Sequence, residues 1–461
     1  MSVIAAFAVP HPPIILPEVG HGEERKIDKT TDAYTEVMSR VAALKPDTIV
    51  ITSPHSVMYA DYFHISPGKT AQGDMGQFRA GNVKFSVDYD TEFVDLLTQS
   101  TENDSIPAGV LGERDKSLDH GTMVPLYYLN KFYSDYKLVR IGLSGLSPFE
   151  HYRLGQCISK TADELDRRVV MIASGDLSHK LKKDGPYGFA QEGPEFDKLL
   201  TEAFEKGDFL SVLSLSSELS DAAAECGLRS FQIMAGALDR KKVTHELISY
   251  EGPFGVGYAV AAFEVIGPDE VRNFGEQFRD MERSLLDNLK SGEDEYVRLA
   301  RLSLETYIKT GKEAKMPEWL PDEMRNKRAG TFVSLKKHGQ LRGCIGTISA
   351  TTNSIAEEIV QNAMSAAVSD PRFSPISEEE LPELVYSVDV LGDAEKISSP
   401  DQLDVKRYGV IVEAGRRRGL LLPNLEGVDT VSEQINIAKK KAGIAPNEKV
   451  DLKRFEVVRH K

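Results

Sequence analysis

The first 266 residues alternate between short apolar runs and longer segments in which apolar residues recur at helical spacing. The runs include 3–9, 48–52 and 168–173, and the helical segments include 32–44 and 148–166. Parallel strands need a connection of a dozen or more residues, which is usually a helix. The alternation therefore predicts an α/β domain, an open sheet with helices on both faces.

The later part of the chain has a different pattern. A polar stretch at 267–270 ends the alternation, and hairpin turn signals then appear at 337–340 and 414–416 among amphipathic helical segments. A chain of 461 residues is also too long for one ordinary core. We therefore expect an α/β domain over residues 1–267 and a smaller α+β domain over residues 275–461.

Charge and cysteine content exclude several classes of protein. The formal net charge of −15 disfavours wholesale binding to nucleic acid or to an anionic membrane surface. Cys157, Cys226 and Cys344 are far apart, so they form neither a disulfide framework nor a CxxC zinc site. No stretch approaches the roughly 18 uncharged apolar residues of a membrane span. We expect a cytoplasmic protein that binds neither nucleic acid nor membrane.

Histidines follow the predicted strands at the points where the strands end. His11, His55 and His179 each come just after an apolar run, and Glu225 stands at a later polar break. In open α/β sheets, ligands bind at the ends of the strands. Two histidines and a carboxylate on one face of a metal are the ligands of non-haem Fe(II) enzymes. The pattern predicts Fe(II) held by His11, His55 and Glu225, with His179 transferring protons near neutral pH.

The third ligand has an alternative. Glu225 and Cys226 are adjacent, and neighbouring side chains on a regular strand point in opposite directions, so only one of them can face the site. A carboxylate suits Fe(II), and we therefore prefer Glu225. A Cys226 thiolate would instead favour zinc, copper(I) or a redox role.

The order of these motifs resembles that of the class III extradiol ring-cleaving dioxygenases, the LigB-like superfamily, and of the related Memo family. The matching segments are Pro10-His11-Pro12, Ser53-Pro54-His55 and Gly175-Asp176-Leu177-Ser178-His179. The resemblance covers roughly residues 1–266. It implies that His11 and His55 bind iron and that His179 is the proton-transfer residue. It also implies a small-molecule substrate, an aromatic diol that chelates the metal.

Two further features belong to the same resemblance. Asp119-His120-Gly121 is similar to a pocket segment in which a histidine, here His120, contacts substrate or oxygen. Asp176 would orient His179 or cap a helix. In Memo proteins a cysteine occupies the carboxylate position, and Cys226-Gly227 resembles that arrangement.

A second constellation lies in the later part of the chain. Leu341-Arg342-Gly343-Cys344-Ile345-Gly346-Thr347 resembles the signature of the AMMECR family, and the resemblance covers about residues 275–461. Arg342 and Cys344 are two residues apart and would share a strand face, where a guanidinium could lower the pKa of the thiol and make it nucleophilic. The alternative is that Cys344 is a small buried hydrophobic residue. That family's activity is not established, so the resemblance implies a fold only.

The fusion of the two domains resembles the protein set named AmmeMemoRadiSam, which includes a radical-SAM enzyme. This chain has no CxxxCxxC motif, so a radical-SAM protein would be a separate partner. Three functions remain open: a dioxygenase-like Fe(II) oxidoreductase, a metal-dependent hydrolase that uses the same ligands, and a non-catalytic Memo-like binding protein. The substrate and the oligomeric state stay open as well.

Overall fold

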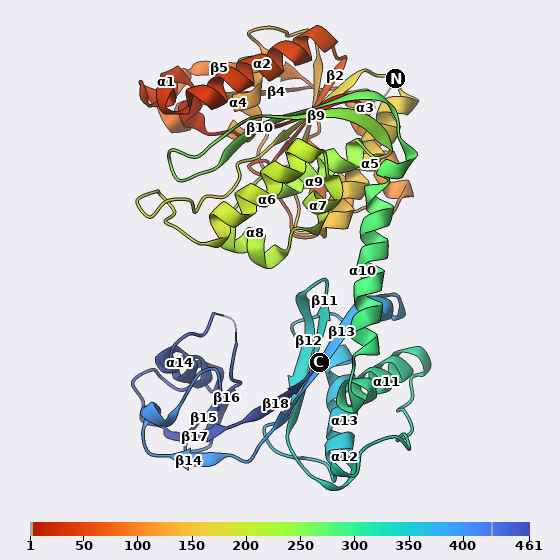
Figure 1. The fold of residues 1–461 in the computed structure, drawn as a ribbon, viewed down its shortest axis with the longest axis vertical. Coiled ribbons are helices and arrows are strands. Elements are labelled where there is room, and N and C mark those ends of the chain that lie inside the picture. The colour runs from red at the N-terminus through yellow and green to blue at the C-terminus, as the bar shows by residue number, and fades with distance from the viewer. Residues whose placement is uncertain (1–2, 426) are drawn as a thin grey trace. The chain divides into compact units, whose positions relative to one another are not determined.

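The computed structural model describes residues 3–425 and 427–461. The chain forms two compact units, Met1–Met281 and Glu282–Lys461 (Figure 1). The division falls within helix α10, Phe274–Ser291, whereas the predicted boundary lies near residue 268. Among the described residues, we find no helix with the length and apolar character needed to cross a bilayer.

The first unit is built on a six-stranded sheet in the order β7-β2-β8-β1-β10-β9. Strands β7, β2, β8 and β1 run parallel, β10 runs antiparallel to β1, and β9 runs antiparallel to β10. This arrangement confirms the predicted α/β class. The strands span β1 Val3–Val9, β2 Thr48–Ser53, β7 Lys137–Gly142, β8 Val169–Ser174, β9 Lys241–Glu251 and β10 Tyr258–Pro268.

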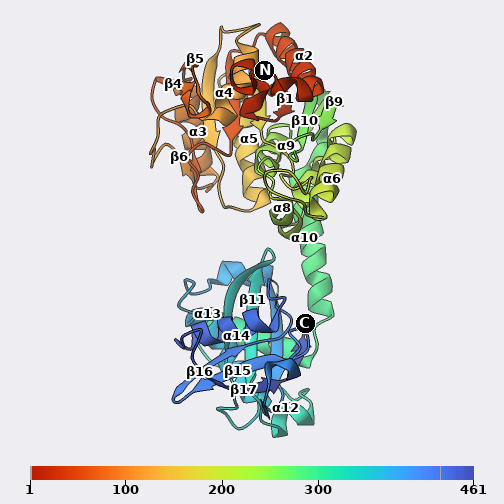
Figure 2. The same cartoon turned by 90° about the vertical axis from the view of Figure 1, so that its left-hand side faces the viewer.

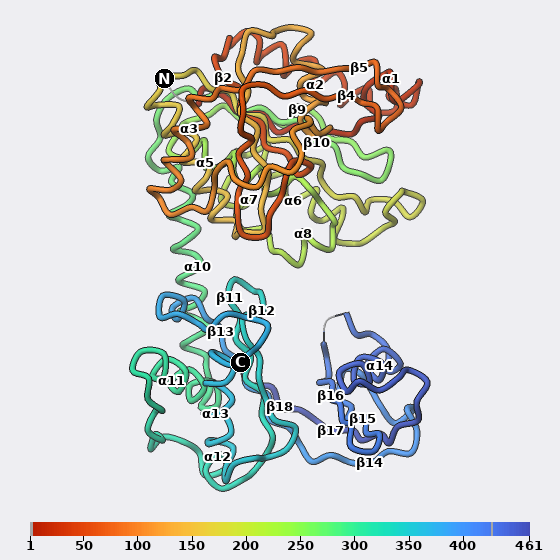
Figure 3. Tube along the Cα trace, turned by 180° about the vertical axis from the view of Figure 1, so that it is seen from behind, coloured from red at the N-terminus to blue at the C-terminus, as the bar shows by residue number. Residues whose placement is uncertain are grey.

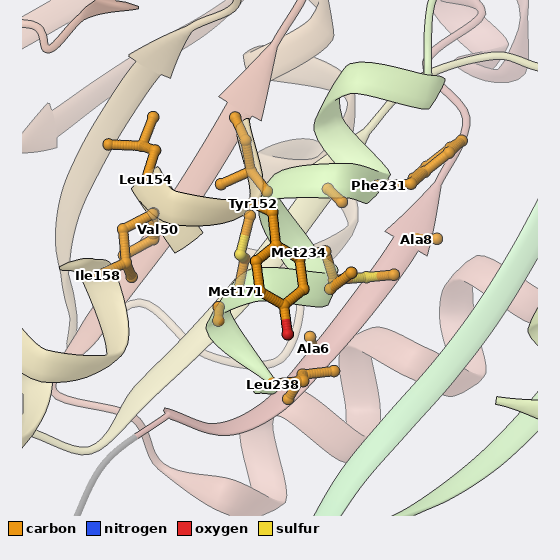
Figure 4. Packing of buried hydrophobic residues seen from close by; sticks show 14 of the residues in the cluster. Ala6, Ala8, Val50, Tyr152, Leu154, Ile158, Met171, Phe231, Met234 and Leu238 are labelled. Atoms are coloured by element: carbon orange, nitrogen blue, oxygen red, sulfur yellow. The ribbon is translucent and has the colours of Figure 1, made fainter. Parts of the chain in front are cut away.

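Helices cover both faces of this sheet (Figure 1 and Figure 2). The apolar sides of α2 and α4 pack on one face, and those of α3, α5, α6, α7 and α9 pack on the other. Figure 4 shows part of the second core, where Tyr152 and Ile158 of α5 and Met234 of α9 lie against Ala6 and Val50 of the sheet. The helices span α1 Pro17–Gly20, α2 Asp28–Leu44, α3 Thr91–Asn103, α4 His120–Leu129, α5 Pro148–Glu164, α6 Glu192–Lys206, α7 Phe209–Ser214, α8 Ser217–Ala223 and α9 Leu228–Ala237.

Short strands lie between β2 and β7 in the sequence, and the sequence pattern did not predict them. Strand β3, Phe63–His64, pairs with β6, Ala108–Gly109, and β4, Thr70–Met75, pairs with β5, Ala80–Asp88. A single 3-10 turn, Gly76–Phe78, connects β4 to β5. These strands are too short or too polar to show a strong alternation of apolar residues. The β4–β5 hairpin forms a wall of the candidate site described below.

The second unit is α+β, as predicted. One sheet has the order β12-β11-β13-β18 and packs against α11 and α13, and another has the order β14-β17-β15-β16 and packs against α14. In Figure 3 the two sheets form separate groups, and β18 leads from one to the other. The elements span α11 Glu295–Thr310, α12 Asp322–Asn326, α13 Ile355–Val368, α14 Val431–Lys441, β11 Thr331–Lys337, β12 Gln340–Gly346, β13 Leu384–Leu391, β14 Glu395–Ile397, β15 Gly409–Ala414, β16 Arg417–Leu421, β17 Asp451–Phe455 and β18 Val457–His460.

One edge of the large sheet collects the loops that carry the predicted site residues. Strands β1, β2 and β8 are parallel and end at Val9, Ser53 and Ser174, so their carboxyl ends meet at this edge. Strand β10 is antiparallel to β1 and therefore begins here, at Tyr258. The loops after β1, β2 and β8 consequently lie side by side, which is where open α/β sheets bind ligands.

Candidate metal and catalytic site

Three histidine rings from different elements meet at this edge. Nε2 of His55 lies 3.0 Å from Nε2 of His11. The ring of His120 lies 4.0 Å from that of His55 and 5.5 Å from that of His11, measured between centroids. His120 is the first residue of α4, and the Asp119 carboxylate accepts the N–H of Thr122 to cap that helix. The structure therefore brings His11, His55 and His120 together.

The surrounding hydrogen bonds fix the tautomer of His11. The Ser174 hydroxyl donates to the carbonyl oxygen of Gly121 at 2.6 Å, so it has only lone pairs left for the His11 ring. Nδ1 of His11 lies 2.9 Å from that hydroxyl oxygen and must carry the proton that it shares. Nε2 of His11 is then unprotonated and faces His55. A hydrogen bond to the other ring nitrogen is the usual way in which proteins orient a metal-binding histidine.

Asp176 connects the loop after β8 to two neighbouring loops. Its carboxylate accepts the backbone N–H of His11 at 2.8 Å. Its own N–H donates to Sγ of Cys226 at 3.3 Å, and its carbonyl oxygen accepts the N–H of Cys226. Asp176 was predicted to orient His179, but its hydrogen bonds within the described chain go to His11 and Cys226. Asp176 therefore ties the loop of His11 and the loop of Cys226 to the loop that follows β8.

Cys226, and not Glu225, turns toward the histidines. The donor atoms of His11, His55 and Cys226 all lie within 4.8 Å of one another, with Sγ of Cys226 3.6 Å from Nε2 of His11. The carboxylate of Glu225 instead accepts the N–H of Leu228 at 2.6 Å, at the first turn of α9. The placement corrects our preference for Glu225.

The local backbone explains that placement. Ala224 adopts the left-handed conformation, with φ of +52°, and ends α8. The chain then turns toward α9, and the two adjacent side chains leave it in different directions. The hydrogen bond from the N–H of Leu228 holds the Glu225 carboxyl at the start of α9, where burial raises its pKa to about 7, and Cys226 is left facing the site.

His179 also lies close to the Cys226 thiol. Ligand atoms of His179, Asp176 and Cys226 form a second group within 4.8 Å. The His179 ring stacks on Tyr187, with 5.1 Å between centroids, and its Nε2 is buried without a hydrogen-bond partner among the described residues. A ring nitrogen in that state is free to exchange a proton with a bound ligand.

Burial keeps the imidazoles neutral at physiological pH. Desolvation, followed by the neighbouring His55, lowers the pKa of His11 to about 3, and desolvation likewise lowers the pKa of His120 to about 3. Burial also lowers the pKa of His55 and raises that of the Cys226 thiol. Neutral imidazole is the form that binds metals. A cation binding here would release the thiol proton, because thiolate is the ligand form of cysteine.

The donor spacing fits a single metal ion. Two nitrogen ligands about 2.1 Å from an ion at ordinary coordination angles lie roughly 3.0–3.4 Å from each other. The nitrogen atoms of His11 and His55 are 3.0 Å apart. Two imidazole nitrogens and one thiol on a sheet edge thus form a donor set suited to a transition metal.

Two hollows open onto the histidines. One has a volume of about 700 Å³ and is lined by His11, His55, His120 and His179. The other, about 970 Å³, shares His55 and His120 with the first. Prolines and aromatic residues supply much of the rest of the smaller hollow, the aromatic ones being Phe78, Tyr187, Phe254 and Tyr258. Polar residues line most of the larger hollow, among them Gln72, Gln77, Lys84 and Arg140.

Several of these residues were not predicted. Arg140 interrupts the apolar run of β7, and this charge within a strand was an available signal of a special environment. Its side chain is 1% exposed; Nε donates to Ser66, and the guanidinium lies 3.7 Å from the Asp119 carboxylate. Ser174 and Phe78 gave no comparable signal, because their roles depend on contacts between distant segments.

In the second unit, Arg342 and Cys344 do not form the pair that the sequence suggested. The Arg342 guanidinium forms hydrogen bonds with Glu380 and with the carbonyl oxygens of Ser374 and Pro375, and none of those described reaches Cys344. Sγ of Cys344 instead accepts a hydrogen bond from Ser334 at 3.1 Å.

The Cys344 peptide group is held from both sides. Asp370 accepts the N–H of Cys344 at 2.9 Å, and Arg372 donates to its carbonyl oxygen at 3.1 Å. Asp370 and Arg372 also pair with each other at 2.7 Å. Because β12 is an edge strand, this pair occupies backbone groups that would otherwise be open to another strand.

Comparison with known proteins agrees with the two-unit architecture. Residues 5–261 match the family model described as the catalytic LigB subunit of aromatic ring-opening dioxygenase, and residues 297–460 match the AMMECR1 model. A protein of Clostridium acetobutylicum is 43% identical over the full length of both chains. A Thermotoga maritima protein is 49% identical over 37% of this chain and 99% of its own length. The solved structure of an uncharacterized Pyrococcus horikoshii protein is 36% identical and covers 36% of this chain and 89% of its own, with a TM-score of 0.34.

Proposed function

Because this chain belongs, through residues 5–261, to the family of the catalytic LigB subunit of aromatic ring-opening dioxygenases, we propose that its first domain is a metal-dependent oxidoreductase. The proposed substrate is a small molecule with an aromatic diol. One observation carries the proposal. Nε2 of His11, Nε2 of His55 and Sγ of Cys226 converge within 4.8 Å at the edge of the sheet.

From the family match we propose Fe(II) as the metal, with His11, His55 and the Cys226 thiolate as its protein ligands, although a thiolate on its own favours a softer ion such as zinc. When bound, such an ion supplies Lewis acidity and one-electron chemistry toward oxygen. Two observations support this donor set. The Ser174 hydrogen bond leaves Nε2 of His11 unprotonated, and Asp176 fixes the backbone of His11 while contacting Cys226.

The remaining residues of the site have separate roles in this proposal. His179, whose Nε2 has no partner among the described residues, accepts a proton from the substrate hydroxyl and later returns it. His120 hydrogen-bonds to the substrate beside His55. Phe78 and Tyr187 supply aromatic walls that bind a ring and limit the access of water.

A zinc-dependent hydrolase is the second candidate, because the structure presents a thiol. Thiolate and imidazole ligands with an open position are typical of catalytic zinc, which activates water. The second domain is proposed to serve the same pathway, with a separate radical-SAM protein as a partner. Its AMMECR1 match extends over residues 297–460.

The test separates the two metals and the two reactions. Protein purified without added metal is assayed for iron and zinc, then loaded anaerobically with Fe(II) and mixed with catechol in an oxygen electrode. We expect stoichiometric iron and catechol-dependent oxygen uptake. His11→Ala should abolish both, and His245→Gln, which changes an exposed histidine of β9, should abolish neither. Zinc content with ester hydrolysis and no oxygen uptake would instead support the hydrolase.

A further inference from the structure

We propose that Tyr258 is a further catalytic residue of this site, whose phenol donates a hydrogen bond to an oxygen atom of the bound substrate. The inference rests on the proposed function, because it takes the substrate to place an oxygen beside His11 and Cys226. It adds a residue that comes from strand β10, outside the loops that carry the other members of the site.

The pairing of β1 with β10 brings Tyr258 to the same edge of the sheet as His11. Strands β1 and β10 are antiparallel, with Ala8 paired to Ala261. Strand β1 ends at Val9, two residues before His11, and β10 begins at Tyr258, so both residues lie at this edge and line the same hollow. The preceding residue, Gly257, accepts the N–H of Leu177 and donates its own N–H to the carbonyl oxygen of Ser178. The start of β10 is therefore fastened to the loop that carries Asp176 and His179.

The ring of Tyr258 is buried, and its hydroxyl has no partner among the described residues. Tyr258 is 4% exposed, and its ring belongs to the same core as Val256 and Val260. It also lines the 700 Å³ hollow with His11 and His179. Its hydroxyl makes no hydrogen bond with the described residues. The hydroxyl oxygen is not among the fully buried polar atoms that lack a partner, so it is accessible from the hollow that Tyr258 lines, and an unpartnered donor there is positioned to bind a ligand.

The chemistry of the site calls for a donor at this position. Each neutral imidazole offers one N–H beside its lone pair, and one N–H of the Lys182 ammonium, which also lines the hollow, goes to the carbonyl oxygen of Pro253; Tyr258 adds an O–H donor to this small set. Burial, and then the carboxyl of Asp176, raise the pKa of Tyr258. The phenol therefore remains protonated at neutral pH. A substrate oxygen that gives up its proton becomes a strong acceptor, and an O–H donor stabilises the charge it gains.

The variant Tyr258→Phe tests this role, because it removes the hydroxyl and keeps the ring in the core. The probe is 4-nitrocatechol, titrated anaerobically into the Fe(II)-loaded full-length chain and followed by its visible absorbance. We expect the Kd to rise about tenfold, as for the loss of one hydrogen bond to a charged group, and the bound spectrum to shift. Iron content and the thermal midpoint should stay those of the wild type.

Tyr127→Phe is the matched control, since its hydroxyl contacts Glu18 and lies outside both hollows. It should leave the Kd and the bound spectrum unchanged. Wild-type affinity and spectrum in iron-loaded Tyr258→Phe would overturn the role of Tyr258 alone. Loss of iron in that variant would also overturn it, by showing a structural role. A wild-type protein that holds no metal would overturn the proposed function together with this inference.

Discussion

Gly175 and Gly227 approach each other so closely that a Cβ atom on Gly175 would collide with the Cα of Gly227. One glycine follows β8, and the other precedes α9. Their contact lets the loop of Asp176 lie against the loop of Cys226, where the N–H of Asp176 donates to Sγ of Cys226 and the N–H of Cys226 donates to the carbonyl oxygen of Asp176. A small residue at each position is therefore a requirement of the site itself.

The first prediction follows from that contact. Gly175→Ala should lower the free energy of unfolding by about 2 kcal/mol or more, because overpacking forces the backbone to shift. It should also separate Cys226 from His11 and reduce the metal content. Urea titration and elemental analysis measure the two effects. Gly81→Ala is the control, since a Cβ there would meet its nearest atom at an ordinary 3.6 Å. Equal behaviour of the two variants would contradict the prediction.

The second prediction concerns the third metal ligand. Cys226→Ser should weaken Fe(II) binding by roughly an order of magnitude or more, since even the loss of a group that only hydrogen-bonds to a metal ligand costs about 10–100-fold. Glu225→Gln should leave binding nearly intact, because the amide oxygen can still accept the N–H of Leu228. Dissociation constants from anaerobic metal titration decide between them. The reverse ranking would restore the carboxylate as the ligand.

The third prediction is a pH dependence of stability at Asp197, which is 1% exposed and accepts hydrogen bonds from Tyr250 and the N–H of Ser178. Burial raises its pKa to about 7. A carboxyl with a raised folded-state pKa stabilises the fold below its unfolded pKa, and that stability is lost as pH rises through about 7. At about 1.4 kcal/mol per pH unit, the wild type should lose about 2 kcal/mol more than Asp197→Asn between pH 5 and pH 8. Urea titrations at the two pH values measure the free energy of unfolding of both proteins. If the two free energies change in parallel with pH, the prediction is wrong.

The fourth prediction lies in the second unit. Hydrogen bonds to Glu282 and Glu383 raise the pKa of His338 to about 9. The charged histidine contributes stability that is complete below its unfolded pKa of about 6.5 and is lost as pH rises through about 9. The contribution is small, because the side chain is 38% exposed. An NMR titration should show His338 still protonated at pH 7.5, and Glu383→Gln should lower its pKa. A midpoint near 6.5 in the wild type would show that the pairs do not form in solution.

Much of the fold was predictable from local pattern. The buried parallel strands of the first domain are continuous apolar runs, and helices of regular spacing separate them, so the α/β class follows from the sequence. The placement of His11 and His55 at one edge follows too, because parallel strands end together. Burial in the β4–β5 hairpin is irregular, and its turn gives Phe78 to the site without a sequence signal.

The sequence alone could not show whether Glu225 or Cys226 faces the metal site. The two residues are neighbours, and alternation along the chain could say only that one of them faces inward. The left-handed turn at Ala224 and the start of α9 decide which. The same holds for Tyr258, which lines the same hollow as His11 because β10 runs antiparallel to β1 and begins at the edge where β1 ends. The sequence by itself determined which residues stand at the ends of strands, because hydrophobic periodicity is local. Only the tertiary structure decided which side chains meet, because register and loop packing join residues that are far apart in the chain.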